Sequence, residues 1–194
     1  EFIHFSIRAL AAAQAARARG FRIKSLLEHP EDLGRTARGT PASIWQLREL
    51  RKIGGCTDFK TVAGQLCQYP GVDRKKPTRL LSEVEGVEAF GEVGWPVFDA
   101  AGYYTGPLPH VCEHGKGAHK QPMIGKNAHG GWDTSPTAAY LAGMCQFLAG
   151  IIFRDWTKSL SKRSPFGAGR VLESQTAPPL TPKTRPTNND DHTK

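Results

Sequence analysis

The chain has 194 residues, 39% of them hydrophobic, and a formal net charge of +8 at pH 7. This length allows one domain with a sizeable core plus appendages, and the lack of any 18-residue apolar run argues against a membrane-spanning helix. The positive charge favours attraction to polyanions, nucleic acid above all; a generally solvated basic surface is the alternative.

The chain opens at Glu1 within a helical pattern and without an initiator methionine, so we expect a piece of a longer protein. Ile3, Ile7 and Leu10 keep helical spacing, which predicts a helix over residues 2–19 that Gly20 ends. Residues 21–28, FRIKSLLE, predict a strand because they form an apolar run bounded by Gly20 and a polar loop.

Further elements follow a polar loop over residues 29–41. Ser43 is a suitable N-cap for a helix over 44–53, whose apolar residues repeat at helical spacing. Residues 57–66 favour a strand because they contain Thr, Phe and Val, and residues 78–84 predict another short strand.

The second half of the chain is less regular. Residues 85–131 are rich in Gly, Pro and His and predict no long element. Ser135 as N-cap and a proline after it predict a helix over 135–153, with Cys145 as an inert buried thiol on its core face. We expect a domain over residues 1–155 and a disordered, basic, Pro-rich tail over 156–194.

Alternating helices and strands with short connections predict an α/β domain built on a partial Rossmann-like sheet with flanking helices. Glu28 is of interest in such a sheet because it follows the strand, where open α/β sheets bind ligands. Pro30 then turns the chain and leaves the carboxylate facing the crevice. A solvated loop acid or a capping residue is the alternative interpretation of Glu28.

The order of segments resembles a known family. A helix, a strand ending in LLEHPEDLG, then PASIWQL and QYPGVDRKKPTRLL resembles the C-terminal half of a cytosine-5 DNA methyltransferase-like domain. The resemblance is to the divergent type that accompanies retroelement and recombinase-like proteins, and it implies a methyltransferase-type sheet. It also implies that Glu28 is catalytic, holding a flipped cytosine by its Watson–Crick edge.

The same resemblance implies S-adenosylmethionine as cofactor of the complete parent protein. The family's Gly-rich cofactor loop and its Pro-Cys nucleophile lie upstream of the corresponding segment, so this chain alone would be inactive. A second family motif, Gln-x-Arg-x-Arg, is matched loosely, with Lys75 at the glutamine and Arg79 at the last arginine. Pro77 replaces the middle arginine, which departs from the family pattern.

The segment GVDRKKPTR contains four cations, which suit contacts to phosphate. We expect this nucleic-acid-binding role for Arg74, Lys75, Lys76 and Arg79, with an ordinary solvated basic turn as the alternative. We further expect Arg79 to lie close enough to Glu28 to share one ligand with it.

The segment HVCEHGKGAH brings His110, Cys112, His114 and His119 within ten residues. A thiolate and imidazoles suit a tetrahedral zinc ion, and we assign Cys112, His114 and His119 as candidate ligands. The alternative is a loop whose histidines hydrogen-bond the backbone or contact phosphate. The other cysteines are widely spaced and form no C-x-x-C pair.

The first functional hypothesis is a fragment of an S-adenosylmethionine-dependent DNA (cytosine-5) methyltransferase-like protein. The alternative is a non-enzymatic nucleic-acid-binding module of a mobile-element protein, stabilised by zinc; a small interaction protein with an incidental basic surface is a third. The expected partners are DNA or another nucleic acid and an N-terminal half encoded by the same gene, with no membrane partner. We expect an intracellular location, with the nucleus as one candidate.

Overall fold

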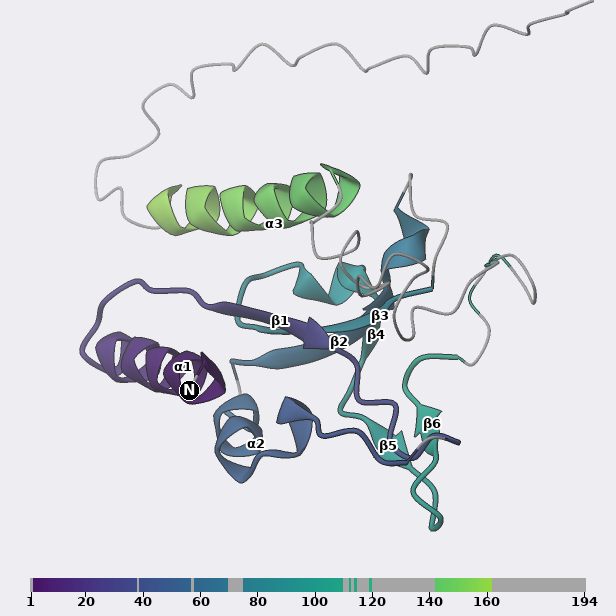
Figure 1. Ribbon diagram of the computed structural model, residues 1–194. Coiled ribbons are helices and arrows are strands. Elements are labelled where there is room, and N and C mark those ends of the chain that lie inside the picture. The colour runs from purple at the N-terminus through teal and green to yellow at the C-terminus, as the bar shows by residue number, and fades with distance from the viewer. Residues whose placement is uncertain are drawn as a thin grey trace, which may run out of the picture. The chain divides into compact units, whose positions relative to one another are not determined.

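The computed structural model describes residues 2–37, 39–56, 58–69, 75–109, 112, 114, 119 and 142–161. These residues form a mixed arrangement of helices and antiparallel sheets (Figure 1). All of them belong to one compact unit, Glu1–Lys162, and the remaining residues, Arg163–Lys194, form a second unit. The described residues contain no helix that is long and apolar enough to cross a membrane.

The main sheet has four strands in the order β1-β3-β2-β4, and every neighbouring pair is antiparallel. Its strands are β1 (Leu26–Pro30), β2 (Lys60–Gln65), β3 (Pro77–Ser82) and β4 (Glu92–Val93). A Rossmann sheet is mostly parallel, so these pairings do not confirm the expected Rossmann-like sheet. The connection from β2 to β3, residues 66–76, is too short for a parallel crossover, which needs a dozen residues or more.

The first predicted strand lies later in the chain than residues 21–28. Phe21 and Ile23 are exposed, and pairing begins only at Leu26. Glu28 therefore sits in the middle of β1 rather than at its end, and β1 is an edge strand, not a central one. The apolar run was a poor guide because its first members pack against no core.

The helices near the N-terminus follow the predictions closely. Helix α1 (Phe2–Ala18) confirms the expected helix over 2–19. The single helix expected over 44–53 is divided into η1 (Ile44–Gln46) and α2 (Arg48–Gly54), because Leu47 between them is extended. Ser43 caps η1 as predicted, since its side chain accepts a hydrogen bond from the backbone N–H of Trp45 at 3.2 Å.

The C-terminal helix, α3, spans Ala142–Ser161. It extends beyond the expected domain limit at residue 155, and residues 135–141, where its start was predicted, lie outside the described residues. Cys145 is exposed, so the prediction of a buried thiol there is wrong. The core face of α3 is instead formed by Met144 and Ile151.

Short elements occupy the region that was expected to be irregular. They are the 3-10 helix η3 (Val87–Phe90) and an antiparallel pair of strands, β5 (Val97–Phe98) and β6 (Tyr104–Gly106). The 3-10 helix η2 (Leu66–Gln68) follows β2 directly. These elements are too short to leave a periodic signal in the sequence.

Helices cover both faces of the main sheet (Figure 1). Leu80 of β3 faces a cluster with Val62, Phe90 and the α3 residues Met144 and Ile151. The next residue, Leu81, points to the other face, because side chains alternate along a strand. There it joins a cluster formed by residues of α1, η1 and α2 and by Phe59, which precedes β2. Its other members are Leu10, Ile44, Trp45, Leu50 and Ile53.

Candidate metal centre

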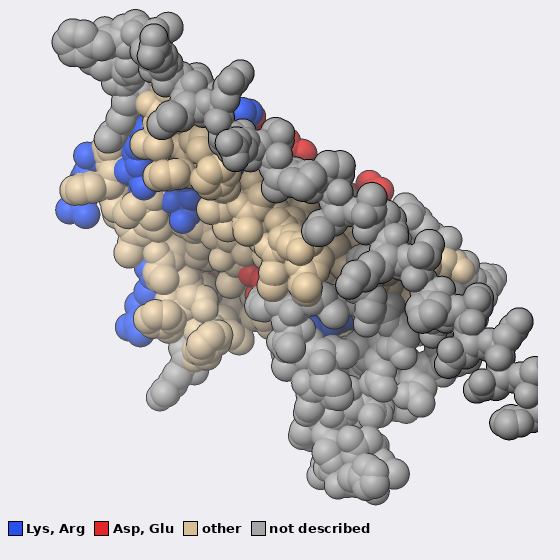
Figure 2. Space-filling model, turned by 90° about the horizontal axis from the view of Figure 1, so that it is seen from above, with Lys and Arg blue, Asp and Glu red and all other residues tan. Residues whose placement is uncertain are grey.

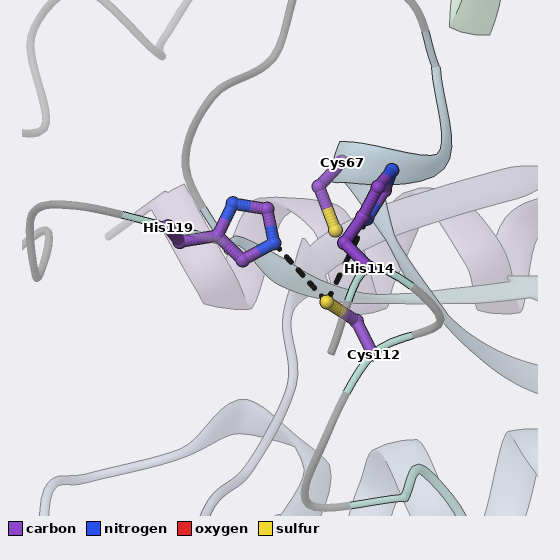
Figure 3. Close-up of side chains that lie close together, drawn as sticks. All are labelled: Cys67, Cys112, His114 and His119. Carbon is purple, nitrogen blue, oxygen red and sulfur yellow. Dashed lines mark hydrogen bonds between the residues drawn. The ribbon is translucent and has the colours of Figure 1, made fainter. Parts of the chain in front are cut away.

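Four potential metal ligands meet between η2 and the segment after β6 (Figure 3). They are Cys67, Cys112, His114 and His119, and their ligand atoms all lie within 4.8 Å of one another. The Cys112 Sγ lies 3.1 Å from His119 Nε2 and 3.7 Å from His114 Nδ1. The two cysteines are buried, whereas His119 is half-buried and His114 is exposed.

Cys67 is held in place by the end of β2. It lies in η2, and the preceding residue, Leu66, is buried in the core cluster beneath α3. The Leu66 N–H donates a hydrogen bond of 3.0 Å to the carbonyl of Lys76, which precedes β3. Strand pairing and core packing thus fix the position of the Cys67 sulfur.

The other ligands approach from the segment after β6. The Leu108 N–H donates to the hydroxyl of the buried Tyr104 at 3.0 Å, which ties this segment to β6 before it reaches Cys112. The rings of His114 and His119 are 5.4 Å apart and nearly perpendicular, and both point toward Cys112 (Figure 3). The two histidines therefore converge on one sulfur from different sides.

The pKa values of the two thiols are shifted in opposite directions. Burial disfavours the Cys112 thiolate, but hydrogen bonds from His114, His119 and Cys67 outweigh that effect and lower the pKa of Cys112 to about 6. Burial raises the pKa of Cys67 to about 11; the nearby Cys112 adds to this, and the charge of Lys75 opposes it. A cation bound between the sulfurs would favour the thiolate form of both.

The donor set fits zinc. Two thiolates and two imidazoles are the ligands of a Cys₂His₂ structural site, whereas magnesium and calcium prefer oxygen ligands. Zn–S and Zn–N bonds of about 2.3 and 2.0 Å place tetrahedral ligand atoms roughly 3.3–3.8 Å apart. Atoms that already lie within 4.8 Å need only small side-chain movements to reach this geometry.

The structure brings together the three predicted ligands and adds one that the sequence did not reveal. Cys67 precedes Cys112 by 45 residues, so no spacing pattern connects it with the others. A cysteine next to a predicted strand end was the only signal for it. His110, the fourth member of the sequence cluster, lies outside the described residues.

Arg79 does not lie where a nucleic-acid contact requires it. Its side chain is fully buried, and its Nε and Nη2 donate to the two carboxylate oxygens of Glu31, at 3.1 and 2.6 Å. Its Nη1 donates to the Thr61 hydroxyl at 2.7 Å and also to the carbonyl of Gly94. The predicted phosphate contact of Arg79 is therefore corrected to a buried structural ion pair.

Glu28 and Arg79 also fail to converge on one ligand. In the β1–β3 register Glu28 is opposite Leu80, and Arg79 is opposite His29. Since residues directly opposite in an antiparallel pair share a face, Glu28 lies on the α3 face with Leu80, and Arg79 lies on the other. The predicted Glu28–Arg79 pair is thus wrong.

The remaining predicted cations lie close to the metal ligands. Lys75 and Lys76 are half-buried and lie just before β3, and the carbonyl of Lys76 bonds to the residue preceding Cys67. Arg74 lies outside the described residues. Of the basic segment, Lys75 and Lys76 therefore lie beside the candidate metal centre.

Comparison of the chain with protein-family models, with curated proteins and with solved structures finds no match.

Proposed function

We propose that this chain is a zinc-stabilised nucleic-acid-binding module. The observation that carries the proposal is the convergence of Cys67, Cys112, His114 and His119 beside the basic segment. The zinc ion is the part that this arrangement supports most directly. Nucleic acid as partner is supported by the net charge of +8 and by the position of the basic segment.

A zinc ion here would serve structure rather than catalysis. Catalytic zinc sites keep one position open for water or substrate, whereas four protein ligands close a tetrahedral site. A closed site would link η2, which directly follows β2, to the segment after β6, which is otherwise tied to the domain by short strands. Two parts of the chain that are distant in sequence would be joined by four metal–ligand bonds.

The same ion would fix the basic segment at one end. The Leu66 N–H beside Cys67 donates a hydrogen bond to the carbonyl of Lys76, a member of the basic segment. Lys75 and Lys76, both half-buried, therefore lie between the candidate metal centre and β3. Lysines in such a position bind phosphates as point charges and carry no sequence specificity.

Exposed cations elsewhere in the domain add to the attraction. On α1 and α2 the exposed basic residues are Arg8, Arg48, Arg51 and Lys52. Figure 2 shows Lys and Arg side chains gathered toward one side of the face viewed there, with few acidic side chains visible among the described residues. We expect weak, sequence-tolerant binding that depends steeply on salt.

The test measures fluorescence anisotropy of labelled mixed-sequence oligonucleotides, single- and double-stranded, with the zinc-loaded chain between about 50 and 200 mM salt. Lys75→Ala/Lys76→Ala should weaken binding and reduce the salt slope on duplex by about 1–2, since each phosphate contact contributes about 0.9. The matched control is Lys60→Ala/Lys158→Ala. It removes the same charge from cations that pair with Glu88 and Glu85.

Zinc removal by a chelator should weaken binding in the same assay. Absence of binding at low salt would contradict the nucleic-acid proposal. Equal losses of affinity for the Lys75/Lys76 substitutions and the control substitutions would also contradict the proposal. The net charge of the chain would then be enough to explain the binding.

The methyltransferase hypothesis stays a prediction from the resemblance. It includes the Rossmann-like sheet, the cofactor S-adenosylmethionine and the catalytic role of Glu28. In the described residues, Glu28 and Arg79 occupy opposite faces of an antiparallel sheet, so we find no geometric feature that favours methyl transfer over binding.

A further inference from the structure

The outer face of α3 is apolar over most of the helix. Ile152, Phe153, Trp156 and Leu160 are each between 46% and 61% exposed. The ring centroids of Phe153 and Trp156 lie 6.1 Å apart, so the two side chains form one continuous surface. In a 20-residue helix whose opposite face is already packed in the core, this outer stripe is without a partner among the described residues.

The stripe has the spacing of a helix–helix seam. Exposed residues 142, 145, 149, 152, 156 and 160 follow one another at intervals of three or four, which places them on one side of the helix. Of the charged residues of α3, Arg154 is exposed, whereas Asp155 and Lys158 contact Glu85 in the body of the domain. Lys158 pairs with Glu85 at 2.5 Å, and Asp155 accepts a hydrogen bond from the Glu85 N–H at 3.3 Å.

The stripe is also graded in size along the helix. Its N-terminal half carries Ala142, Cys145 and Ala149, and its C-terminal half carries Phe153, Trp156 and Leu160. When a second α3 is laid antiparallel with its two-fold axis near Ile151, small residues face large ones. The facing pairs are then Ala142 with Leu160, Cys145 with Trp156 and Ala149 with Phe153 of the second copy.

We propose that this chain forms a symmetric dimer in which the outer faces of two α3 helices pack antiparallel. A two-fold interface places the same surface of both copies in contact, and it is the commonest symmetry of soluble oligomers. The small-to-large gradient makes this surface complementary to itself in the antiparallel direction. In a parallel pair, Trp156 would meet Trp156 and the small residues would leave a gap.

The area is that of a modest interface. Four side chains that are about half exposed offer on the order of 400 Å² per copy, given about 150–250 Å² for a whole aromatic side chain. Two copies thus contribute roughly 800 Å², and the small residues and flanks bring the total to about the 1,000 Å² that a specific interface needs. We therefore expect a dimer that dissociates at micromolar concentrations.

The experiment is analytical ultracentrifugation of the full, zinc-loaded chain under reducing conditions across a range of concentrations. The wild-type chain should show a monomer–dimer equilibrium. Ala149→Phe should weaken the dimer about tenfold or more because two phenylalanines then collide, and Phe153→Ala should weaken it by opening a gap. Ala149→Phe/Phe153→Ala exchanges large and small residues and should restore the dimer.

Phe5→Ala is the control, because Phe5 is as exposed as Phe153 but lies on α1. It should leave the equilibrium unchanged, and melting of every variant should stay close to that of the wild type since these side chains are exposed. A wild-type chain that is monomeric at every concentration overturns the proposal. This would hold even if the apolar stripe of α3 bound lipid vesicles instead of a second copy. If neither single substitution weakens the dimer, the proposed interface is wrong. It is also wrong if the double substitution does not restore the dimer.

Discussion

The guanidinium of Arg79 and the carboxylate of Glu31 form a two-point ion pair that is completely buried in the domain. Glu31 directly follows β1, and Arg79 lies in β3. The same guanidinium donates to the Thr61 hydroxyl in β2 and to the Gly94 carbonyl after β4. One side chain of β3 thus connects to β2 and to the residues that directly follow β1 and β4.

Breaking this pair should be costly. We expect Arg79→Met to lower the free energy of unfolding by about 3–5 kcal/mol, because it leaves the Glu31 carboxylate buried without a counter-charge. Arg79→Met/Glu31→Leu should cost clearly less than the sum of the two single changes. Urea unfolding of the single and double variants measures this coupling.

Lys60→Met is the control, since the Lys60–Glu88 pair is exposed and should contribute less than about 1 kcal/mol. Additive costs for Arg79 and Glu31 would show that the two side chains do not act as a pair.

The second prediction concerns the ligand that was missing from the sequence interpretation. Cys67→Ser should weaken zinc binding as much as Cys112→Ser does, by more than the roughly 10- to 100-fold typical of residues that only support a ligand. Competition with a chromophoric chelator measures both affinities. Cys56→Ser is the control, because Cys56 is exposed and lies outside the cluster; equal effects of all three substitutions would contradict the assignment.

Metal removal should also lower the thermal stability. A ligand present at 100 times its dissociation constant stabilises the folded state by about 2.7 kcal/mol, so a strong chelator should lower the melting temperature of the wild-type chain. Cys67→Ser/Cys112→Ser should melt at the lower temperature with or without chelator. Calorimetry in both conditions distinguishes this result from a general effect of the chelator on the wild-type chain.

The fourth prediction separates the binding module from the methyltransferase hypothesis. Glu28→Gln should leave oligonucleotide affinity unchanged, because Glu28 lies in the middle of β1 and is not part of the proposed basic binding surface. Lys75→Ala/Lys76→Ala should weaken binding in the same anisotropy assay. A large loss of affinity with Glu28→Gln would restore Glu28 as a contact to the base.

Local signals predicted the elements that depend on local chemistry. The helix over 2–18, strands β2 and β3 and the Ser43 cap follow from spacing, propensity and side-chain hydrogen bonding within a few residues. The direction in which strands pair is set by contacts between distant residues. The sequence alone therefore suggested a Rossmann-like sheet, a type that is mostly parallel, where β1, β3, β2 and β4 pair antiparallel.

The site residues divide in the same way. Cys112, His114 and His119 lie within eight residues and could be found by spacing, whereas Cys67 joins them only through the fold. Arg79 was expected to contact phosphate because it lies among the four cations of the segment GVDRKKPTR. Its buried partner, Glu31, lies 48 residues away, so the ion pair could not be seen in the sequence.

The most direct test of the metal centre is X-ray absorption at the zinc edge, combined with metal analysis, on the full chain purified without added metal. The account predicts one zinc per chain, with two sulfur ligands at about 2.3 Å and two nitrogen ligands at about 2.0 Å. Cys67→Ser should reduce the sulfur count to one or remove the metal. A wild-type chain without bound zinc, or a zinc shell with only one sulfur, would contradict the four-ligand centre.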